Sequence, residues 1–117
     1  MSKAYTDSYL NADGVPEIRP DQLKENADNV FIVDVRRPEE FGGELGHITG
    51  AKLMTLETEL QSKLGGLDKS QSYVFVCRSG RRSTKATLMA QELGFVDVYN
   101  MQGGMLRWNA MQFPVEK

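Results

Sequence analysis

The sequence predicts an α/β protein in which a parallel sheet is covered by helices on both faces. Short, continuous apolar runs, typical of strands buried on both sides, alternate along the chain with segments that have helical periodicity. This alternation favours a parallel sheet, because neighbouring parallel strands need a crossover connection that is usually a helix. Ligands of such sheets bind outside the carboxyl ends of the strands. We therefore look for function in the polar residues that follow each strand.

The first part of the chain predicts an arm followed by a short helix. Residues 1–16 show no periodicity of apolar side chains, and they end at Pro16. We expect residues 1–16 to form a flexible N-terminal arm and residues 17–117 to form the domain. Residues 20–25 begin with a proline, which suits the first turn of a helix, so they predict a short helix.

Three apolar runs predict strands. Residues 30–33 and 73–76 are continuously apolar, and residues 96–99 predict a further strand. After the first of these strands, residues 38–40 predict a short helix with acidic side chains in its first turn, where the helix dipole favours them. The glycines at positions 42 and 43 are expected to end this helix.

Three further segments have helical spacing. In residues 56–64 leucine recurs every four residues, and Thr58 with Gln61 resembles a capping box. A longer helix is predicted between Ser83 or Thr84 and Gly94, with an apolar stripe of Ala86, Met89, Ala90 and Leu93. Residues 105–108 predict the core of the last helix.

The composition is typical of a single soluble domain. A chain of 117 residues with 40% hydrophobic and 26% charged residues is long enough to bury a core. The net charge of −2 gives no reason to expect a nucleic acid or a membrane surface as partner, and no apolar run approaches a membrane span. A lone cysteine without a Cys/His cluster suggests neither a disulfide nor a metal, so we expect a cytoplasmic protein without cofactors.

The single cysteine, Cys77, lies where a predicted strand meets the start of a predicted helix. Backbone N–H groups at a helix start are unpaired and attract anions, so they favour the thiolate form of a thiol placed there. Arg78, Arg81 and Arg82 add positive charge within five residues. Cys77 is therefore a candidate nucleophile, provided that its sulfur is not sealed in the hydrophobic interior. Asp34 also follows a strand, so we expect it at the same edge of the sheet.

Three motifs, in this order along the chain, resemble the rhodanese family of sulfurtransferases. They are Asp34–Arg36 with Pro38–Phe41 and Gly46–Ala51, then the loop Cys77–Ser83, then Gly103-Gly104 with Trp108. The resemblance implies a rhodanese-like three-layer domain with a central parallel sheet of about five strands. It also implies transfer of sulfane sulfur, through a persulfide on Cys77, from thiosulfate or a persulfide or polysulfide donor to a thiol or cyanide acceptor.

The implied active-site loop contains the six residues that follow the cysteine: Arg78, Ser79, Gly80, Arg81, Arg82 and Ser83. We expect Arg78 and Arg81 to project outward and bind a small anionic sulfur donor, and Arg82 to stabilise the loop from the helix start. Ser79 and Gly80 are small and permissive residues that let backbone amides converge.

Asp34 and Arg36 are expected to support the rim of the site. We expect them to act through hydrogen bonds and through an ion pair with Glu39 or Glu40. His47 is the only histidine, and the resemblance places it in the scaffold rather than in the chemistry. Gly103 and Gly104 suggest a close approach of two backbone segments beside the loop.

Two other functions are open alternatives. A cysteine-dependent phosphatase, or by extension an arsenate reductase, would need an arginine six residues after the cysteine to grip two oxygens of a tetrahedral group, but that position is Ser83. A partner-dedicated sulfur-relay module would use the same fold to pass sulfur to a protein thiol.

Overall fold

The computed structural model describes residues 3–117, so the first two residues of the predicted arm lie outside the described residues. Within residues 3–117 the sheet has six strands in the order β1-β2-β6-β5-β3-β4. Neighbouring strands are parallel, except that β1 is antiparallel to β2. The strands are β1 (Tyr9–Leu10), β2 (Pro16–Ile18), β3 (Phe31–Asp34), β4 (Lys52–Leu53), β5 (Tyr73–Val76) and β6 (Val98–Met101). The predicted parallel sheet is confirmed, with a short antiparallel strand added at one edge.

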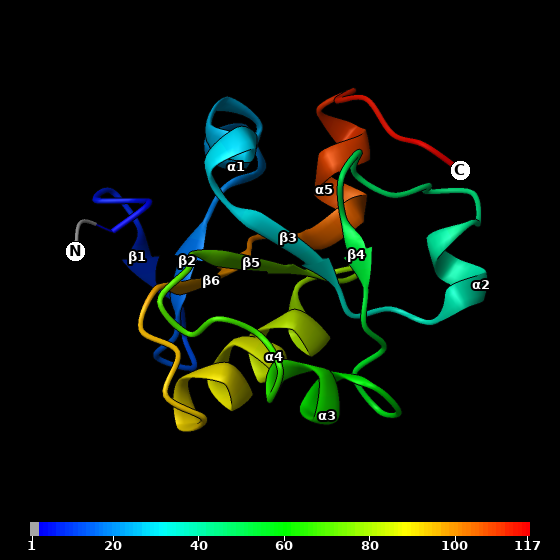
Figure 1. The fold of residues 1–117 in the computed structure, drawn as a ribbon. Coiled ribbons are helices and arrows are strands. Elements are labelled where there is room, and N and C mark those ends of the chain that lie inside the picture. Colours follow the sequence, from blue (N-terminus) through cyan, green and yellow to red (C-terminus); the bar gives the residue numbers. More distant parts are fainter. Residues whose placement is uncertain (1–2) are drawn as a thin grey trace.

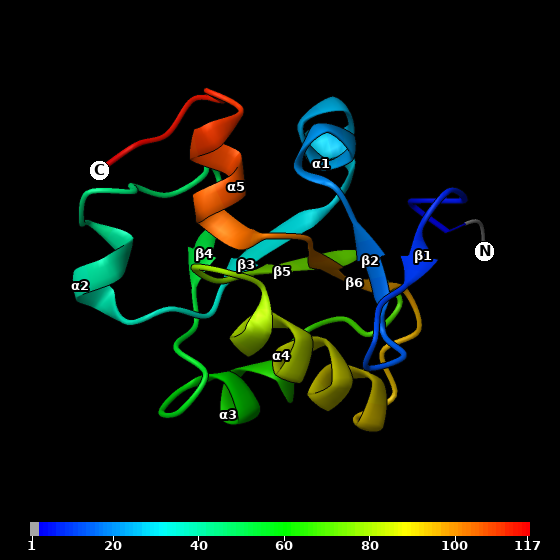
Figure 2. The same ribbon diagram turned by 180° about the vertical axis from the view of Figure 1, so that it is seen from behind.

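Helices cover both faces of this sheet, as predicted. Figures 1 and 2 show α1 and α5 on one face and α3 and α4 on the other, while α2 lies beyond the end of β3. The helices are α1 (Pro20–Asn26), the 3-10 helix η1 (Ala27–Asn29), α2 (Pro38–Phe41), α3 (Leu60–Leu64), α4 (Arg81–Glu92) and α5 (Gly104–Ala110). None of the described helices is both long and apolar enough to cross a membrane.

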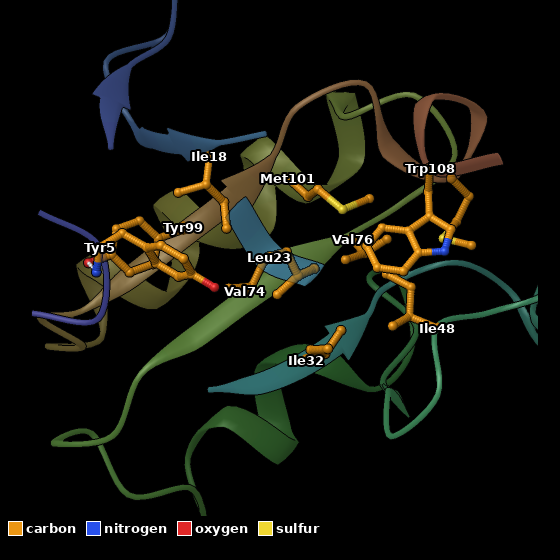
Figure 3. Packing of buried hydrophobic residues seen from close by; sticks show 11 residues of the cluster. Tyr5, Ile18, Leu23, Ile32, Ile48, Val74, Val76, Tyr99, Met101 and Trp108 are labelled. Carbon is orange, nitrogen blue, oxygen red and sulfur yellow. Dashed lines mark hydrogen bonds between the residues drawn. The ribbon is translucent and has the colours of Figure 1, made fainter. Parts of the chain in front are cut away.

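Two apolar clusters hold the three layers together. The cluster under α1 and α5 is shown in Figure 3 and includes Leu23, Val74, Met101 and Trp108. The cluster under α3 and α4 includes Leu64, Phe75, Ala86 and also Cys77. All four residues of β5 are buried, which agrees with a strand that is covered on both faces.

The start of α3 differs from the prediction. The helix begins at Leu60 rather than near Leu56, and its N-cap residue Glu59 makes no side-chain cap hydrogen bond. The reason is tertiary, because the backbone N–H of Leu56 donates to Val35 O at 3.0 Å, extending the pairing at the edge of the sheet. Residues 56–59 form a turn in which the N–H groups of Thr58 and Glu59 donate to Thr55 O, and the helix begins only after it. Thr58 is therefore not the N-cap residue, and the expected capping box with Gln61 is not formed.

The last strand also begins later than predicted, at Val98 instead of position 96. Val96 is 63% exposed, and the ladder with β5 starts where Val98 faces Tyr73. Asp97 is occupied in the preceding turn, where its carboxylate accepts hydrogen bonds from Ser72 Oγ and Tyr99 Oη.

Residues 3–16 pack against the domain more closely than the sequence indicates. They contribute β1, and Tyr5 and Val15 are buried. Asn11 Nδ2 donates to Glu17 Oε2 at 3.1 Å and lies 3.2 Å from Thr84 Oγ1, which joins this segment to β2 and α4. A domain boundary at residue 17 stays a prediction.

The strand register brings the two polar strand ends together. Asp34, the last residue of β3, faces Val76, the last residue of β5. Cys77 follows directly, so Asp34 and Cys77 lie at the same edge of the sheet, as expected. Figure 2 shows the starts of α4 and α5 meeting at this edge.

Candidate active site

A tight turn at Gly80 places the start of α4 over the sulfur of Cys77. Gly80 has φ +102°, a conformation that only glycine adopts without strain. Its backbone N–H donates to Cys77 Sγ at 3.0 Å. The turn thus points a main-chain donor at the sulfur, as the sequence predicts for a helix start.

The start of α5 holds the other side of the loop. The N–H groups of Met105 and Leu106 donate to the carbonyl oxygens of Cys77 and Arg78, at 2.8 and 3.0 Å. Gly104 has φ +57°, and a Cβ atom there would lie 2.4 Å from Cys77 O and 2.5 Å from Arg78 O. The predicted close backbone approach is therefore present at Gly104, whereas a Cβ at Gly103 would meet the side chain of Arg107.

Cys77 itself is almost completely covered, with 1% of its surface exposed. It belongs to the apolar cluster under α3 and α4, which the sequence did not indicate. The sulfur nevertheless has polar contacts, because Ser83 Oγ lies 3.3 Å from Sγ in addition to the Gly80 donor. The thiol therefore lies at the boundary between the apolar core and a polar loop.

The arginines of the loop divide into two kinds. Arg78 and Arg81 are exposed, as is Ser79. Arg82 instead reaches α2 and binds Glu40 with two hydrogen bonds, of 2.7 and 2.8 Å. These bonds lower the pKa of Glu40 from its ordinary 4.5 to about 2, and they raise the pKa of Arg82 further above its usual range. The ion pair ties the first turn of α4 to α2.

Asp34 and Arg36 form a buried ion pair, and each has 1% of its surface exposed. Arg36 Nε and Nη2 lie 2.9 and 2.7 Å from the Asp34 carboxylate, and Nη2 also donates to Gly46 O at 2.7 Å. The expected ion pair of Arg36 with Glu39 or Glu40 was wrong. Side chains two residues apart on an extended segment point the same way, so Arg36 reaches Asp34, while Glu40 is bound to Arg82.

A cavity of about 260 Å³ lies between this rim and the loop. Its lining carries both charges, and Cys77 is not part of it: the lining residues are Arg36, Glu39, Glu40, Gly43, Glu44, Leu45 and Arg78. Arg78 is thus the residue that connects the cavity with the loop.

His47 occupies a structural position. Its ring stacks on Phe41 with 3.7 Å between ring centroids, and its Nδ1 lies 2.9 Å from Phe41 O. These contacts join the end of α2 to the segment that precedes β4, which agrees with the scaffold position implied by the family resemblance.

Sequence reasoning missed two polar residues behind the cysteine. Asn100 on β6 is 1% exposed, and its Oδ1 lies 2.5 Å from Ser83 Oγ. Its Nδ2 donates to Glu17 Oε2 on β2 at 2.6 Å. A buried asparagine within an otherwise apolar strand was the signal that could have identified them, because a buried amide needs partners.

Comparisons with known proteins agree with these observations. Residues 19–111 match the family described as "Rhodanese-like domain". The chain is 35% identical to "Putative sulfurtransferase YtwF" of Bacillus subtilis, covering 86% of this chain and 96% of that protein. It is 29% identical to "Thiosulfate sulfurtransferase GlpE" of Pseudomonas aeruginosa, covering 86% and 89%. Three other curated relatives are longer, and the chain spans 51 to 59% of them.

The fold comparison gives the same result. The crystal structure of a rhodanese-related protein from Thermoplasma volcanium superposes with a TM-score of 0.76 at 28% identity. The match covers 84% of this chain and 94% of that one. The two proteins therefore share a fold over most of this chain.

Proposed function

Because the chain belongs to the rhodanese-like domain family, whose relatives include named sulfurtransferases, we propose that it transfers sulfane sulfur through a persulfide on Cys77. One observation carries this proposal. The sulfur of Cys77 receives a hydrogen bond from the Gly80 amide and lies next to the Ser83 hydroxyl. The amide stabilises a negative charge on sulfur, in the thiolate and in the persulfide, and the hydroxyl does so when its proton points at the sulfur.

The reaction divides into two transfers that share one covalent intermediate. The Cys77 thiolate attacks the outer sulfur of thiosulfate, a sulfur–sulfur bond forms on the enzyme, and the sulfur–sulfur bond of the donor breaks to release sulfite. A thiolate or cyanide acceptor then attacks the outer sulfur of the persulfide and leaves with it. The electron pair of the broken bond returns to Cys77 as thiolate, so neither an oxidant nor a second cysteine is needed.

The remaining residues of the loop bind and orient. Arg78 and Arg81 are exposed, which suits attraction of an anionic donor, and Arg78 also reaches the neighbouring cavity. Two ion pairs hold the surrounding structure in place. The pair of Arg82 with Glu40 fixes the loop, and the pair of Arg36 with Asp34 fixes the rim. Ser79 and Gly80 give the turn its shape.

The low exposure of Cys77 sets a condition on this chemistry. With 1% of the surface of Cys77 exposed, the sulfur can meet a donor only when part of its surroundings moves aside. Ser79 is exposed and Gly80 is the most permissive residue of the turn, so this short segment is the part of the site that we expect to open.

The test is the mass of the intact protein after incubation with a donor. Thiosulfate, polysulfide or a thiol persulfide should add the mass of one sulfur atom, and Cys77→Ser should abolish both this gain and thiocyanate formation from cyanide. Cys77→Ser combined with Ser62→Cys is a matched control, because it moves the only thiol to an exposed position on α3. Sulfur gain in the control equal to that of the wild type would refute a special role of the loop.

The alternatives give different results in the same assay series. Turnover of an aryl phosphate without sulfur gain would favour the phosphatase, although Ser83 occupies the position of the required arginine and is buried. A persulfide that forms but passes only to a protein thiol would indicate a relay module. Whether the protein is an independent sulfurtransferase or a relay module, we place it in the cytoplasm, because a lone nucleophilic thiol suits a reducing compartment.

A further inference from the structure

A line of hydrogen bonds leads from the sulfur of Cys77 through three elements of the fold. Ser83 Oγ on α4 lies 3.3 Å from Cys77 Sγ and 2.5 Å from Asn100 Oδ1 on β6. Asn100 Nδ2 in turn lies 2.6 Å from Glu17 Oε2 on β2. Ser83 and Asn100 are 0% and 1% exposed, so these two side chains depend on one another for hydrogen bonds.

The Ser83 hydroxyl has more acceptors than it can serve. A hydroxyl carries one proton and can donate one hydrogen bond at a time. Both Cys77 Sγ and Asn100 Oδ1 lie within reach of that proton. When the proton points at Asn100, a lone pair of Ser83 faces the sulfur, which suits a protonated thiol. When it points at Cys77, it stabilises a thiolate.

Glu17 decides which end of the Asn100 amide faces Ser83. An ionised carboxylate only accepts hydrogen bonds, so it holds the NH₂ group of Asn100 toward itself. The carbonyl oxygen of the amide must then face Ser83 as an acceptor. Asn11 Nδ2 donates to the same carboxylate oxygen at 3.1 Å and helps to hold Glu17 in place.

We propose that Asn100, oriented by Glu17, competes with Cys77 for the Ser83 hydroxyl proton and thereby sets how readily Cys77 becomes a thiolate. This inference rests on the proposed function only in taking the thiolate as the reacting form. Asn100 and Glu17 are positioning residues, because they act through Ser83 and touch no reacting atom. Their effect is to disfavour formation of the thiolate until another hydrogen-bond donor or an incoming substrate stabilises its charge.

Other charged groups surround the loop and stay unchanged in the test. They are Arg78, Arg81 and Arg82 at the start of α4, Glu40 on α2, and the Asp34–Arg36 pair at the end of β3. Ser83→Ala, Asn100→Leu and their combination keep all of these groups, so differences among these variants are not caused by a change of formal charge at the loop.

The measurement is the rate of Cys77 alkylation by iodoacetamide as a function of pH. The quantity compared between variants is the midpoint, the pH at which this rate reaches half of its maximum. Ser83→Ala removes the donor and should raise the midpoint by about one pH unit, the effect of about 1.4 kcal/mol on the thiolate. Asn100→Leu removes the competing acceptor and should lower the midpoint by a similar amount. A purely structural role of Asn100 does not predict a lower midpoint.

The double variant Ser83→Ala with Asn100→Leu tests the path of the effect. Its midpoint should equal that of Ser83→Ala, because Asn100 acts only through the hydroxyl. If Asn100→Leu does not fold, Glu17→Gln replaces it and should lower the midpoint by a smaller amount that vanishes in the Ser83→Ala background. A raised or unchanged midpoint, or a shift that persists without Ser83, would overturn the proposal.

Alkylation needs no sulfur donor, so this test is separate from that of the proposed function. Opposite shifts for Ser83→Ala and Asn100→Leu in a protein that transfers no sulfur would support the inference and refute the sulfurtransferase. Sulfur transfer without these shifts would support the sulfurtransferase and refute the inference.

Discussion

Replacing Glu40 with glutamine removes the carboxylate that joins α2 to the first turn of α4. In the structure, Arg82 Nη1 and Nη2 bind the two carboxylate oxygens at 2.7 and 2.8 Å. About a quarter of each side chain is exposed, 28% for Arg82 and 27% for Glu40. The ion pair is therefore partly shielded from water, and we expect its loss to be measurable.

The magnitude follows from the pKa of Glu40. The hydrogen bonds from Arg82 lower this pKa from 4.5 to about 2, which corresponds to an upper bound of about 3 kcal/mol of stability. Solvent screening of the exposed part reduces the expected contribution to about 1 to 2 kcal/mol. Because the folded pKa is the lower one, the contribution is complete above about pH 5, and it decreases as the pH falls from 4.5 toward 2.

Urea unfolding at neutral pH and near pH 3 tests this reasoning. Glu40→Gln should lower the free energy of unfolding by about 1 to 2 kcal/mol at neutral pH, and the difference from the wild type should shrink by more than half near pH 3. Glu39→Gln is the matched control, because Glu39 is the exposed neighbouring residue on the same helix. A difference that stays constant with pH, or one shared by Glu39→Gln, would refute the ion pair as its cause.

Three other changes have outcomes that the geometry determines. Gly104→Ala places a Cβ 2.4 Å from Cys77 O, so it should lower the free energy of unfolding in urea by at least about 2 kcal/mol and abolish sulfur transfer. Gly42→Ala, with open space around it, should be tolerated. Equal effects of the two changes would contradict the close approach. Arg36→Met leaves Asp34 buried without its partner and should cost about 3 to 5 kcal/mol by thermal unfolding; a small loss would mean that the pair is dispensable. Arg78→Ala should raise the KM for thiosulfate more than it lowers kcat in steady-state kinetics, and unchanged kinetics would exclude a binding role.

Local patterns were sufficient to predict the layers and the position of the cysteine. The apolar run of β5, the polar loop and the amphipathic pattern of α4 are contiguous, so the strand, the turn and the helix could each be recognised from neighbouring residues. Gly104 also carried its own signal, because its close approach to the backbone of Cys77 and Arg78 leaves no room for a Cβ atom.

Partners that are distant along the chain could not be predicted in the same way. Arg82 and Glu40 are 42 residues apart, and Asn100 and Glu17 are 83 residues apart. No spacing rule connects such residues, since only the folded sheet and its helices bring them together. The late start of α3 has a similar cause, because Leu56 pairs with the backbone of Val35 at the sheet edge and the helix begins only after the turn that follows.

The burial of Cys77 is compatible with sulfur transfer because the atom that travels is not the sulfur that is buried. In a persulfide the outer sulfur lies about 2 Å beyond Sγ, at the usual sulfur–sulfur bond length. Gly80 N–H and Ser83 Oγ contact Sγ from the loop side, and apolar side chains surround the rest of Cys77. We therefore expect an outer sulfur to extend toward the polar loop rather than into the apolar cluster. Once the turn at Ser79 and Gly80 has moved aside, the outer sulfur would lie at the edge of the sheet, within reach of an acceptor.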